Sequence, residues 1–209
     1  MDQTCRTCRT GQSLQSIYDR LLLHFGPQHW WPGETPFEVC VGAILTQNTA
    51  WTNVEKAIQN LKNAGLMSFE AMLTAPIDRV AELIKPAGYF HIKAKRLKSF
   101  LSSIQENFGT FDDIMNRSKV QGPRSKVPDL QPSTFNLRPS TIREFLLSIK
   151  GIGPETADSM VLYAFNLPTF VVDTYTHRVL VRHGLIEEEA DYYQIKDFCE
   201  SHLERDAVM

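Results

Sequence analysis

Asp173 is the residue of this sequence whose surroundings most need a chemical explanation. It follows the apolar run Phe170-Val171-Val172 and stands at the expected start of a helix in "TFVVDTYTHRVL". A carboxylate at this position can cap the helix by accepting hydrogen bonds from its first N–H groups. It can also stabilise a developing positive charge or deprotonate a water. An isolated aspartate before a helix favours the capping role, so the neighbouring motifs decide between the two.

A glycine-containing turn precedes this aspartate in "FLLSIKGIGPETADSMVLYAF", residues 145–165. Gly151 can take a positive φ without steric cost, and Gly153 lets another backbone approach closely. Pro154 suits the first turn of the following helix, whose free N–H groups and positive dipole end suit a phosphate. Taken alone, the turn favours an ordinary antiparallel helical hairpin.

Helical periodicity predicts an all-α protein around these residues. The pattern indicates helices at 14–25, 37–47, 50–64, 91–109 and 141–150, with no convincing strand alternation. Caps are expected at Asn48-Thr49, Ser68, Thr74 and Ser140. Periodicity lapses over 116–139, where four prolines predict a long exposed loop.

Composition and charge limit the function classes. No apolar run approaches the roughly 18 residues of a membrane span, and the N-terminus does not resemble a secretory signal, so a cytoplasmic address is expected. The formal net charge is −2, but residues 85–105 contain only basic charges: Lys85, Lys93, Lys95, Arg96 and Lys98. This cluster fits either a solvated helix face or a phosphate-facing patch.

The hairpin, the loop after it and Asp173 together resemble the signature of the helix-hairpin-helix (HhH-GPD) DNA glycosylase superfamily. "AILTQNTAWTNVEKA" (43–57) and "GYFHIKAKRLKSFL" (88–101) extend the likeness, which is closest to the endonuclease III-like branch and, within it, to monofunctional glycosylases of the 3-methyladenine type. The resemblance implies a two-lobed fold. A six-helix barrel-like lobe would span 37–167, with an insert at 118–136, and residues 1–36 plus 168–209 would form a second helical lobe carrying Asp173, with the cleft between the lobes holding this residue.

The resemblance also implies a reaction. Such enzymes flip a damaged nucleotide out of duplex DNA, and Asp173 would support hydrolysis of the N-glycosidic bond. Glu155 matches the position where bifunctional relatives carry a Schiff-base lysine, and a carboxylate cannot form an imine. We therefore expect a monofunctional base-excision-repair glycosylase acting on an alkylated or mispaired base. The alternatives are a bifunctional glycosylase/AP lyase, using Lys150, and a non-catalytic helix-hairpin-helix DNA-binding module.

Further site residues follow from the resemblance. Gln47 would fill the gap left by the flipped base, although a helix cap explains it as well, and Tyr89 would be a wedge in the base stack, although core packing is an alternative. Aromatic rings can hold a flipped base or pack in the core, and the candidates are Trp30, Trp31 and Trp51. The remaining predicted DNA contacts are Lys93, Lys95, Arg96, Lys98, Gly151, Gly153 and Thr156.

The expected partner is double-stranded DNA, bound by a monomer associated with the nucleoid. Backbone carbonyls of Leu147, Ile149 and Ile152 match those that hold K+ or Na+ in related hairpins. Many relatives bind a [4Fe-4S] cluster through four cysteines beyond the last helix. This sequence ends at "CESHLERDAVM" and its cysteines are Cys5, Cys8, Cys40 and Cys199, so no cluster is expected.

Overall fold

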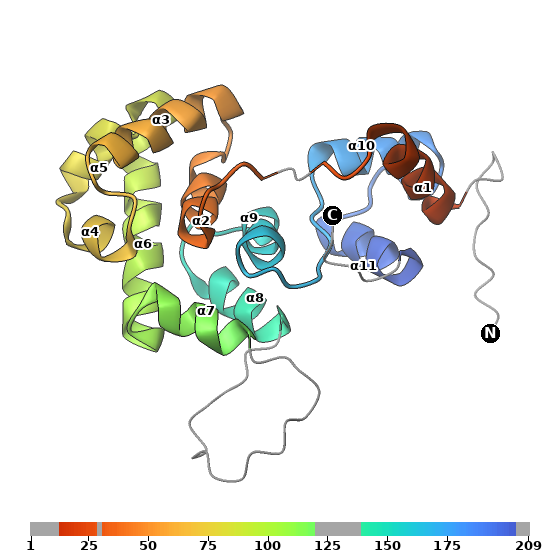
Figure 1. Cartoon of the computed structure of the whole chain (residues 1–209). Helices are drawn as coiled ribbons and strands as arrows, with labels where there is room; N and C mark the ends of the chain where they lie inside the picture. Colours follow the sequence, from red (N-terminus) through yellow and green to blue (C-terminus); the bar gives the residue numbers. More distant parts are fainter. Residues whose placement is uncertain (1–12, 29–30, 120–138, 204–209) are drawn as a thin grey trace, which may run out of the picture. The chain divides into compact units, whose positions relative to one another are not determined.

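The structure is a computed structural model that describes residues 13–28, 31–119 and 139–203. These residues form helices joined by turns and loops, and none of them lies in a β-strand (Figure 1). The prediction of an all-α fold is therefore confirmed for this part of the chain. In chain order the helices are α1 (Leu14–Phe25), α2 (Pro36–Leu45), α3 (Trp51–Asn63), α4 (Phe69–Thr74), α5 (Ile77–Leu83), η1 (Lys85–Ala87), α6 (Phe90–Phe108), α7 (Phe111–Lys119), α8 (Pro139–Ser148), α9 (Pro154–Ser159), η2 (Met160–Ala164), α10 (Thr174–Arg182) and α11 (Tyr192–His202).

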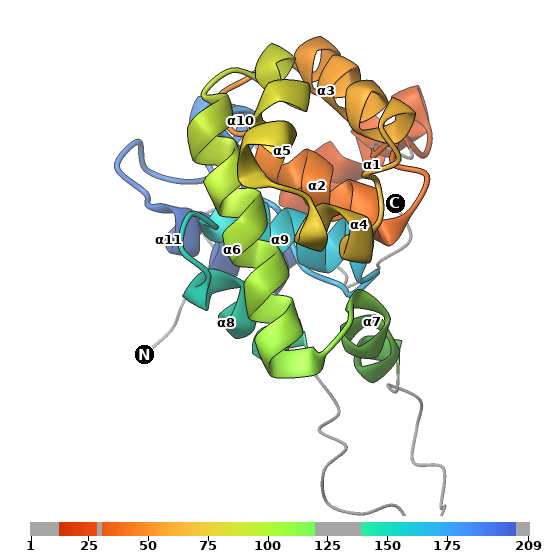
Figure 2. The ribbon, with the colours of Figure 1, turned by 90° about the vertical axis from the view of Figure 1, so that its left-hand side faces the viewer.

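The chain divides into two compact units, each with its own apolar core. The larger unit comprises residues 31–167, and the smaller unit comprises residues 1–30 and 168–209. In the larger unit the long α6 runs beside α4 and α5, and α9 and η2 pack against α2 (Figures 1 and 2). In the smaller unit α1, α10 and α11 share a core formed by Leu14, Val172, Leu180, Ile195 and Cys199.

The central helix α2 is buried along its whole length after its first residue. Its sequence is almost continuously apolar, so every face can pack against neighbouring helices. The Thr35 hydroxyl caps it by accepting a hydrogen bond from the Glu38 N–H at 3.1 Å. The one acid in the helix, Glu38, lies 3.0 Å from the Lys62 ammonium, which compensates the burial of its carboxylate.

Three predicted helix caps are wrong. The residue before α3 is Ala50, which makes no side-chain cap, and Thr49 instead donates a hydrogen bond to the Ala87 carbonyl at 2.7 Å. Thr74 is the last residue of α4 and bonds back to the Glu70 carbonyl. Ser140 lies inside the first turn of α8. The Ser68 cap of α4 is confirmed by its hydrogen bond from the Ala71 N–H.

Helix α7 begins before the predicted loop and extends into it. It starts at Phe111 and continues to Lys119, because Phe111, Ile114 and Met115 are buried in the core of the larger unit. Residues 120–138, which include most of the predicted 118–136 insert, lie outside the described residues, as does Trp30.

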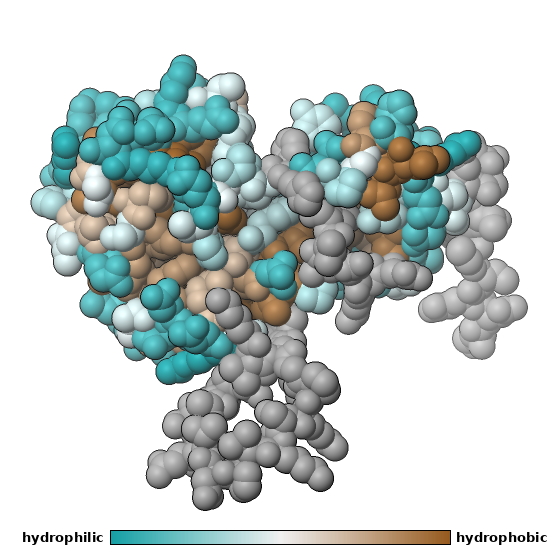
Figure 3. Space-filling model, viewed as in Figure 1, coloured by the Kyte–Doolittle hydropathy of each residue, from teal (hydrophilic) through white to brown (hydrophobic). Residues whose placement is uncertain are grey.

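Large apolar side chains are exposed on α1 in the smaller unit. Figure 3 shows hydrophobic residues over this helix, where Leu21, Leu22, Leu23 and Phe25 are exposed.

Within the described residues, no helix is both long enough and apolar enough to cross a bilayer.

Candidate active site

The turn between α8 and α9 has the backbone geometry that its glycines allow. Gly151 has φ +96°, a conformation that side chains other than glycine adopt at a cost. The Ile152 N–H donates to the Ile149 carbonyl at 3.1 Å and closes the turn. Gly153 is the N-cap of α9 in extended conformation, and Pro154 is its first residue. The predicted helical hairpin is therefore present, and its second helix continues from α9 into the short π-helix η2.

The two glycines of this turn have opposite surroundings. A Cβ on Gly151 would lie 2.5 Å from Cγ of Arg96, so the turn packs directly on that side chain. A Cβ on Gly153 would meet no atom of the chain within 4 Å. The backbone at Gly151 is therefore packed against another part of the protein, whereas the space beside Gly153 is open to an external molecule.

Gln47 joins this turn to the rest of the larger unit. Its Nε2 donates to the Gly151 carbonyl at 3.1 Å and to the Thr156 hydroxyl at 3.0 Å, while its Oε1 accepts a hydrogen bond from Arg96. The side chain of Thr156 is buried and bonded to Gln47, and the DNA contact of this residue stays a prediction. The DNA contacts of Gln47 and Arg96 stay predictions, and in this structure the two side chains bind each other.

The basic segment of α6 is only partly a surface patch. Lys93 is 1% exposed and its ammonium donates to the carbonyls of Leu45 at 2.8 Å and Ala87 at 2.7 Å. Lys98 donates to the carbonyls at the end of α4, among them Met72 at 2.7 Å. The predicted phosphate contacts of these two lysines are therefore wrong, because both ammonium groups are committed to backbone carbonyls. Lys95 is exposed and remains a candidate.

Tyr89 lies in an unusual backbone conformation at the start of α6. Its φ is +44° and its ψ is +32°, and its side chain is 70% exposed. Core packing, the alternative explanation for this aromatic residue, does not apply. A large exposed ring on a left-handed residue suits a surface contact better than a structural role.

Trp31 and Trp51 belong to an aromatic cluster that also includes Tyr163. The Trp31 ring lies 5.6 Å from that of Trp51 and 5.3 Å from that of Tyr163. Gly42 of α2 gives them room, since a Cβ there would lie 3.4 Å from Nε1 of Trp31. Nε1 of Trp51 donates to Glu55 at 2.8 Å, whereas the buried Nε1 of Trp31 has no hydrogen-bond partner in the described chain. A buried donor of this kind can serve a ligand.

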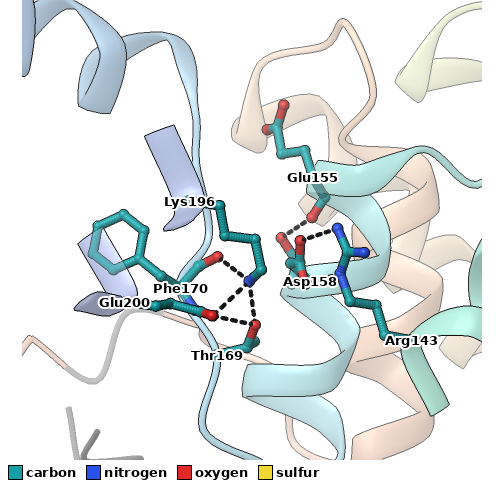
Figure 4. A network of polar contacts seen from close by, with 8 residues as sticks. Arg143, Glu155, Asp158, Thr169, Phe170, Lys196 and Glu200 are labelled. Atoms are coloured by element: carbon teal, nitrogen blue, oxygen red, sulfur yellow. Dashed lines mark hydrogen bonds and ion pairs between the residues drawn. The ribbon is translucent and has the colours of Figure 1, made fainter. Parts of the chain in front are cut away.

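A buried ion pair, which the sequence analysis missed, fixes the hairpin helices to each other. Nε of Arg143 donates to Asp158 at 2.7 Å and Nη2 donates to its second oxygen at 3.0 Å, and Asp158 is fully buried. Figure 4 shows that the exposed carboxylate of Glu155 points away from this pair. Residues three apart lie on the same side of a helix, so the spacing of these two acids did not signal that Asp158 is buried and Glu155 exposed.

Asp173 is the N-cap of α10, and it is half-buried. Its Oδ1 accepts hydrogen bonds from the Thr176 N–H at 2.7 Å and from the Thr176 hydroxyl at 2.8 Å. Among the described residues, no hydrogen bond is recorded to Oδ2. The cap therefore orients the carboxylate through one oxygen and leaves the second available.

The loop before Asp173 is held to α11 by a compact polar network (Figure 4). The Lys196 ammonium donates to the Thr169 hydroxyl and to the Phe170 carbonyl at 2.8 Å, and it lies 2.8 Å from the Glu200 carboxylate. Burial alone would raise the pKa of Glu200, but hydrogen bonds from Lys196 and the Phe170 N–H outweigh it and hold that pKa below its usual range. The network thus fixes the backbone that leads into the catalytic candidate.

Metal ligands are not grouped in the part of the chain that the structure describes. No cluster of three or more His, Cys, Asp or Glu residues able to hold a metal occurs there. Cys40 and Cys199 are each fully buried in a different core, and burial raises both thiol pKa values, that of Cys199 to about 12. Because Cys40 and Cys199 lie in separate cores, they do not form a pair of neighbouring ligands; Cys5 and Cys8 lie outside the described residues.

Comparison with known proteins agrees with this geometry. The family model of the HhH-GPD superfamily base excision DNA repair proteins matches residues 41–205. "Putative DNA repair glycosylase MJ1434" of Methanocaldococcus jannaschii is 44% identical over 195 residues, covering 93% of this chain and 80% of the relative. Among solved structures, H. pylori 3-methyladenine DNA glycosylase (MagIII) bound to 1,N6-ethenoadenine has a TM-score of 0.70 at 32% identity, covering 90% of this chain and 79% of that one. A non-covalent endonuclease III–DNA complex shares the fold, with a TM-score of 0.72 at 17% identity, covering 93% and 78%.

The all-α fold, the glycine-containing hairpin and the aspartate that follows it in the chain thus define a helix-hairpin-helix protein. The chain belongs to the HhH-GPD superfamily of base excision DNA repair proteins. The resemblance drawn from the hairpin and Asp173 is confirmed, as is the assignment to the DNA glycosylase family.

Proposed function

We propose that this protein is a monofunctional DNA glycosylase that removes an alkylated base from duplex DNA by hydrolysis. The observation that carries the proposal is Asp173, a half-buried helix cap whose Oδ1 is fixed by Thr176 and whose Oδ2 is available. A carboxylate held in this way is preorganised for a cationic transition state, because its orientation does not change during the reaction.

Under this proposal Asp173 acts on the sugar. As the bond between C1′ and the base nitrogen breaks, the electron pair leaves with the base and positive charge develops on C1′ and the ring oxygen. The Asp173 carboxylate stabilises that charge and takes a proton from the water that adds to C1′. The products are the free base and an abasic site, and the strand stays intact.

Glu155 supports the monofunctional form of the reaction. It occupies the second position of α9, the place that the family resemblance assigns to the lysine nucleophile of bifunctional members, and it is exposed. An amine there would attack C1′ as the base leaves, and opening of the sugar ring would give an imine, the intermediate from which the strand is cleaved. A carboxylate offers no such path.

The aromatic cluster supports an alkylated purine as the substrate. The rings of Trp31 and Trp51 can stack on a flipped base, and the unpartnered Nε1–H of Trp31 can donate to one acceptor on it. The 32% identical H. pylori protein is a 3-methyladenine glycosylase seen with 1,N6-ethenoadenine, also a modified adenine. We extend this substrate class to the present chain.

The DNA surface of this proposal combines the hairpin with the start of α6. The open turn at Gly153 and the positive end of α9 would receive a phosphate, and exposed Lys95 would add a salt-dependent contact. The exposed ring of Tyr89 would enter the base stack. The turn closed between Ile149 and Ile152 is compatible with K+ or Na+ held by the carbonyls of Leu147, Ile149 and Ile152, which would supply positive charge beside that phosphate.

Replacing Asp173 by Asn tests the proposal. Asp173→Asn should lower release of free methylated base from methylated duplex DNA by at least about a thousandfold, while affinity for DNA containing an abasic-site analogue is kept. Released base is measured by chromatography and affinity by fluorescence anisotropy. Full release by the variant would exclude Asp173 as the catalytic group.

Asp191→Asn is the matched control. Asp191 is also an N-cap aspartate of the smaller unit, and its Oδ1 accepts from the N–H groups of Tyr193 and Gln194 at 2.8 and 2.9 Å. Because Asn caps helices about as well as Asp, this replacement should change its cap as little as Asp173→Asn changes the cap of α10, and it should leave base release at the wild-type rate. Equal losses in both variants would show that capping, and not chemistry, explains the effect.

A further inference from the structure

Two loops of the larger unit carry exposed residues with positive φ, and they lie next to each other. Asn48, in the turn after α2, has φ +54° and is exposed, and Tyr89, in the loop before α6, has φ +44°. The Thr49 hydroxyl donates to the Ala87 carbonyl at 2.7 Å, which ties one loop to the other. The left-handed conformation is strained for a bulky residue such as Tyr89, so the surrounding contacts must hold this loop in place.

The strongest of these contacts comes from a buried lysine. The Lys93 ammonium reaches from α6 to the Leu45 carbonyl at 2.8 Å and to the Ala87 carbonyl at 2.7 Å. Leu45 ends α2 and Ala87 ends η1, so the ammonium meets two carbonyls at helix C-termini, where the backbone carries partial negative charge. Leu45 and Ala87 precede Asn48 and Tyr89 by three and two residues.

Burying the charged ammonium of Lys93 at this position has an electrostatic cost. Burial lowers the pKa of its ammonium, and the neighbouring Arg96 lowers it further. Its side chain is 1% exposed. A buried cation without a carboxylate partner is retained only where its hydrogen bonds repay desolvation, and here those bonds go to the two loops.

We propose that Lys93 is a positioning residue that holds Asn48 and Tyr89 at a fixed spacing, so that both can enter the base stack when a nucleotide leaves a paired duplex. The inference rests on the proposed glycosylase function and adds a group that never touches DNA. Its effect is preorganisation: loops that are ordered beforehand do not lose entropy at the moment of insertion.

Lys98 provides the matched comparison. It lies on the same helix, its ammonium also donates to backbone carbonyls, and burial lowers its pKa. Those carbonyls belong to Met72, Leu73 and Ala75 at the end of α4. Loss of Lys98 should therefore affect stability without affecting the two loops.

The experiment measures single-turnover base release from a methylated strand in two contexts: fully paired, or annealed to a strand that leaves a short unpaired bubble around the methylated base. Lys93→Met should lose about tenfold or more on the paired duplex and about twofold or less on the bubble, where little opening is required. Lys98→Met should reduce both by one common factor. All variants are assayed below their melting transitions.

Thr49→Val removes the hydrogen bond to the Ala87 carbonyl with little change in side-chain shape. It should lower the ratio of base release on the paired duplex to that on the bubble, by a smaller factor than Lys93→Met does. The test therefore stands even if Lys93→Met folds poorly. Equal losses on the two substrates for Lys93→Met and Thr49→Val would overturn the inference while leaving the proposed function standing. Failure of the wild-type protein to release base from either substrate would overturn the proposed function and this inference with it.

Discussion

The two oxygens of Asp173 are in different situations. Oδ1 accepts both hydrogen bonds from Thr176, whereas Oδ2 has no recorded partner in the described chain. Capping and catalysis are therefore compatible at one residue, because the cap fixes the orientation that the chemistry needs. The cap also explains why an acid can follow the apolar run that ends at buried Val172.

Under the proposed function, Glu155 decides whether the DNA strand is cleaved after the base has left. Because it is exposed at the start of α9, replacement by lysine should be tolerated and should place an amine at the position of the lyase nucleophile. The positive end of the helix favours the neutral amine that attacks. We predict that Glu155→Lys forms a covalent adduct with abasic-site DNA on borohydride reduction, detected as a slower band in a denaturing gel.

The wild-type protein and Glu155→Gln should form no such adduct, since neither has an amine at this position. An adduct with the wild-type protein would contradict the monofunctional proposal and direct attention to Lys150, which is exposed beside the turn.

At the scale of the elements, the hairpin separates internal packing from external binding. Gly151→Ala should destabilise the protein by about 1–3 kcal/mol, because a left-handed residue is strained and its Cβ would collide with Arg96. Gly153→Ala should leave the melting temperature unchanged, since its Cβ meets no atom of the chain, yet weaken DNA binding if a phosphate approaches there. Thermal melts and anisotropy titrations over several salt concentrations measure the two effects.

Wild-type affinity and salt slope in Gly153→Ala would show that DNA does not approach this turn closely. The two glycine variants thus serve as controls for each other, because Gly151→Ala tests folding and Gly153→Ala tests DNA binding in the same loop.

Helices and caps that depend on neighbouring residues could be predicted from the sequence. The apolar run of α2 and the Asp173 cap of α10 are examples, since both follow from local pattern. The sequence could not show where the lysine side chains of α6 point. A segment with five basic residues and no acid looks like a phosphate patch, but Lys93 and Lys98 face carbonyls that only tertiary packing brings together.

The Gln47 network was hidden for the same reason. Its hydrogen bonds reach Gly151 and Thr156, more than a hundred positions along the chain. The sequence could suggest that each of these residues matters, but it could not show that they contact one another.

At the scale of the whole molecule, the candidate residues belong to two units that have separate cores. Glu155, Trp31 and the hairpin belong to the larger unit, and Asp173 belongs to the smaller unit. A stability change in a variant can therefore be assigned to one unit: Asp173→Asn concerns the core around Val172 and Leu180, and Gly151→Ala concerns the core around α2.

The most direct measurement is a time course in which free base and strand nicking are scored in the same tubes of methylated duplex DNA with the wild-type protein. The monofunctional proposal predicts free methylated base, with no nicking beyond that of abasic sites left without protein. Nicking that rises together with base release would contradict this proposal, because an amine elsewhere in the chain would then have to form the imine.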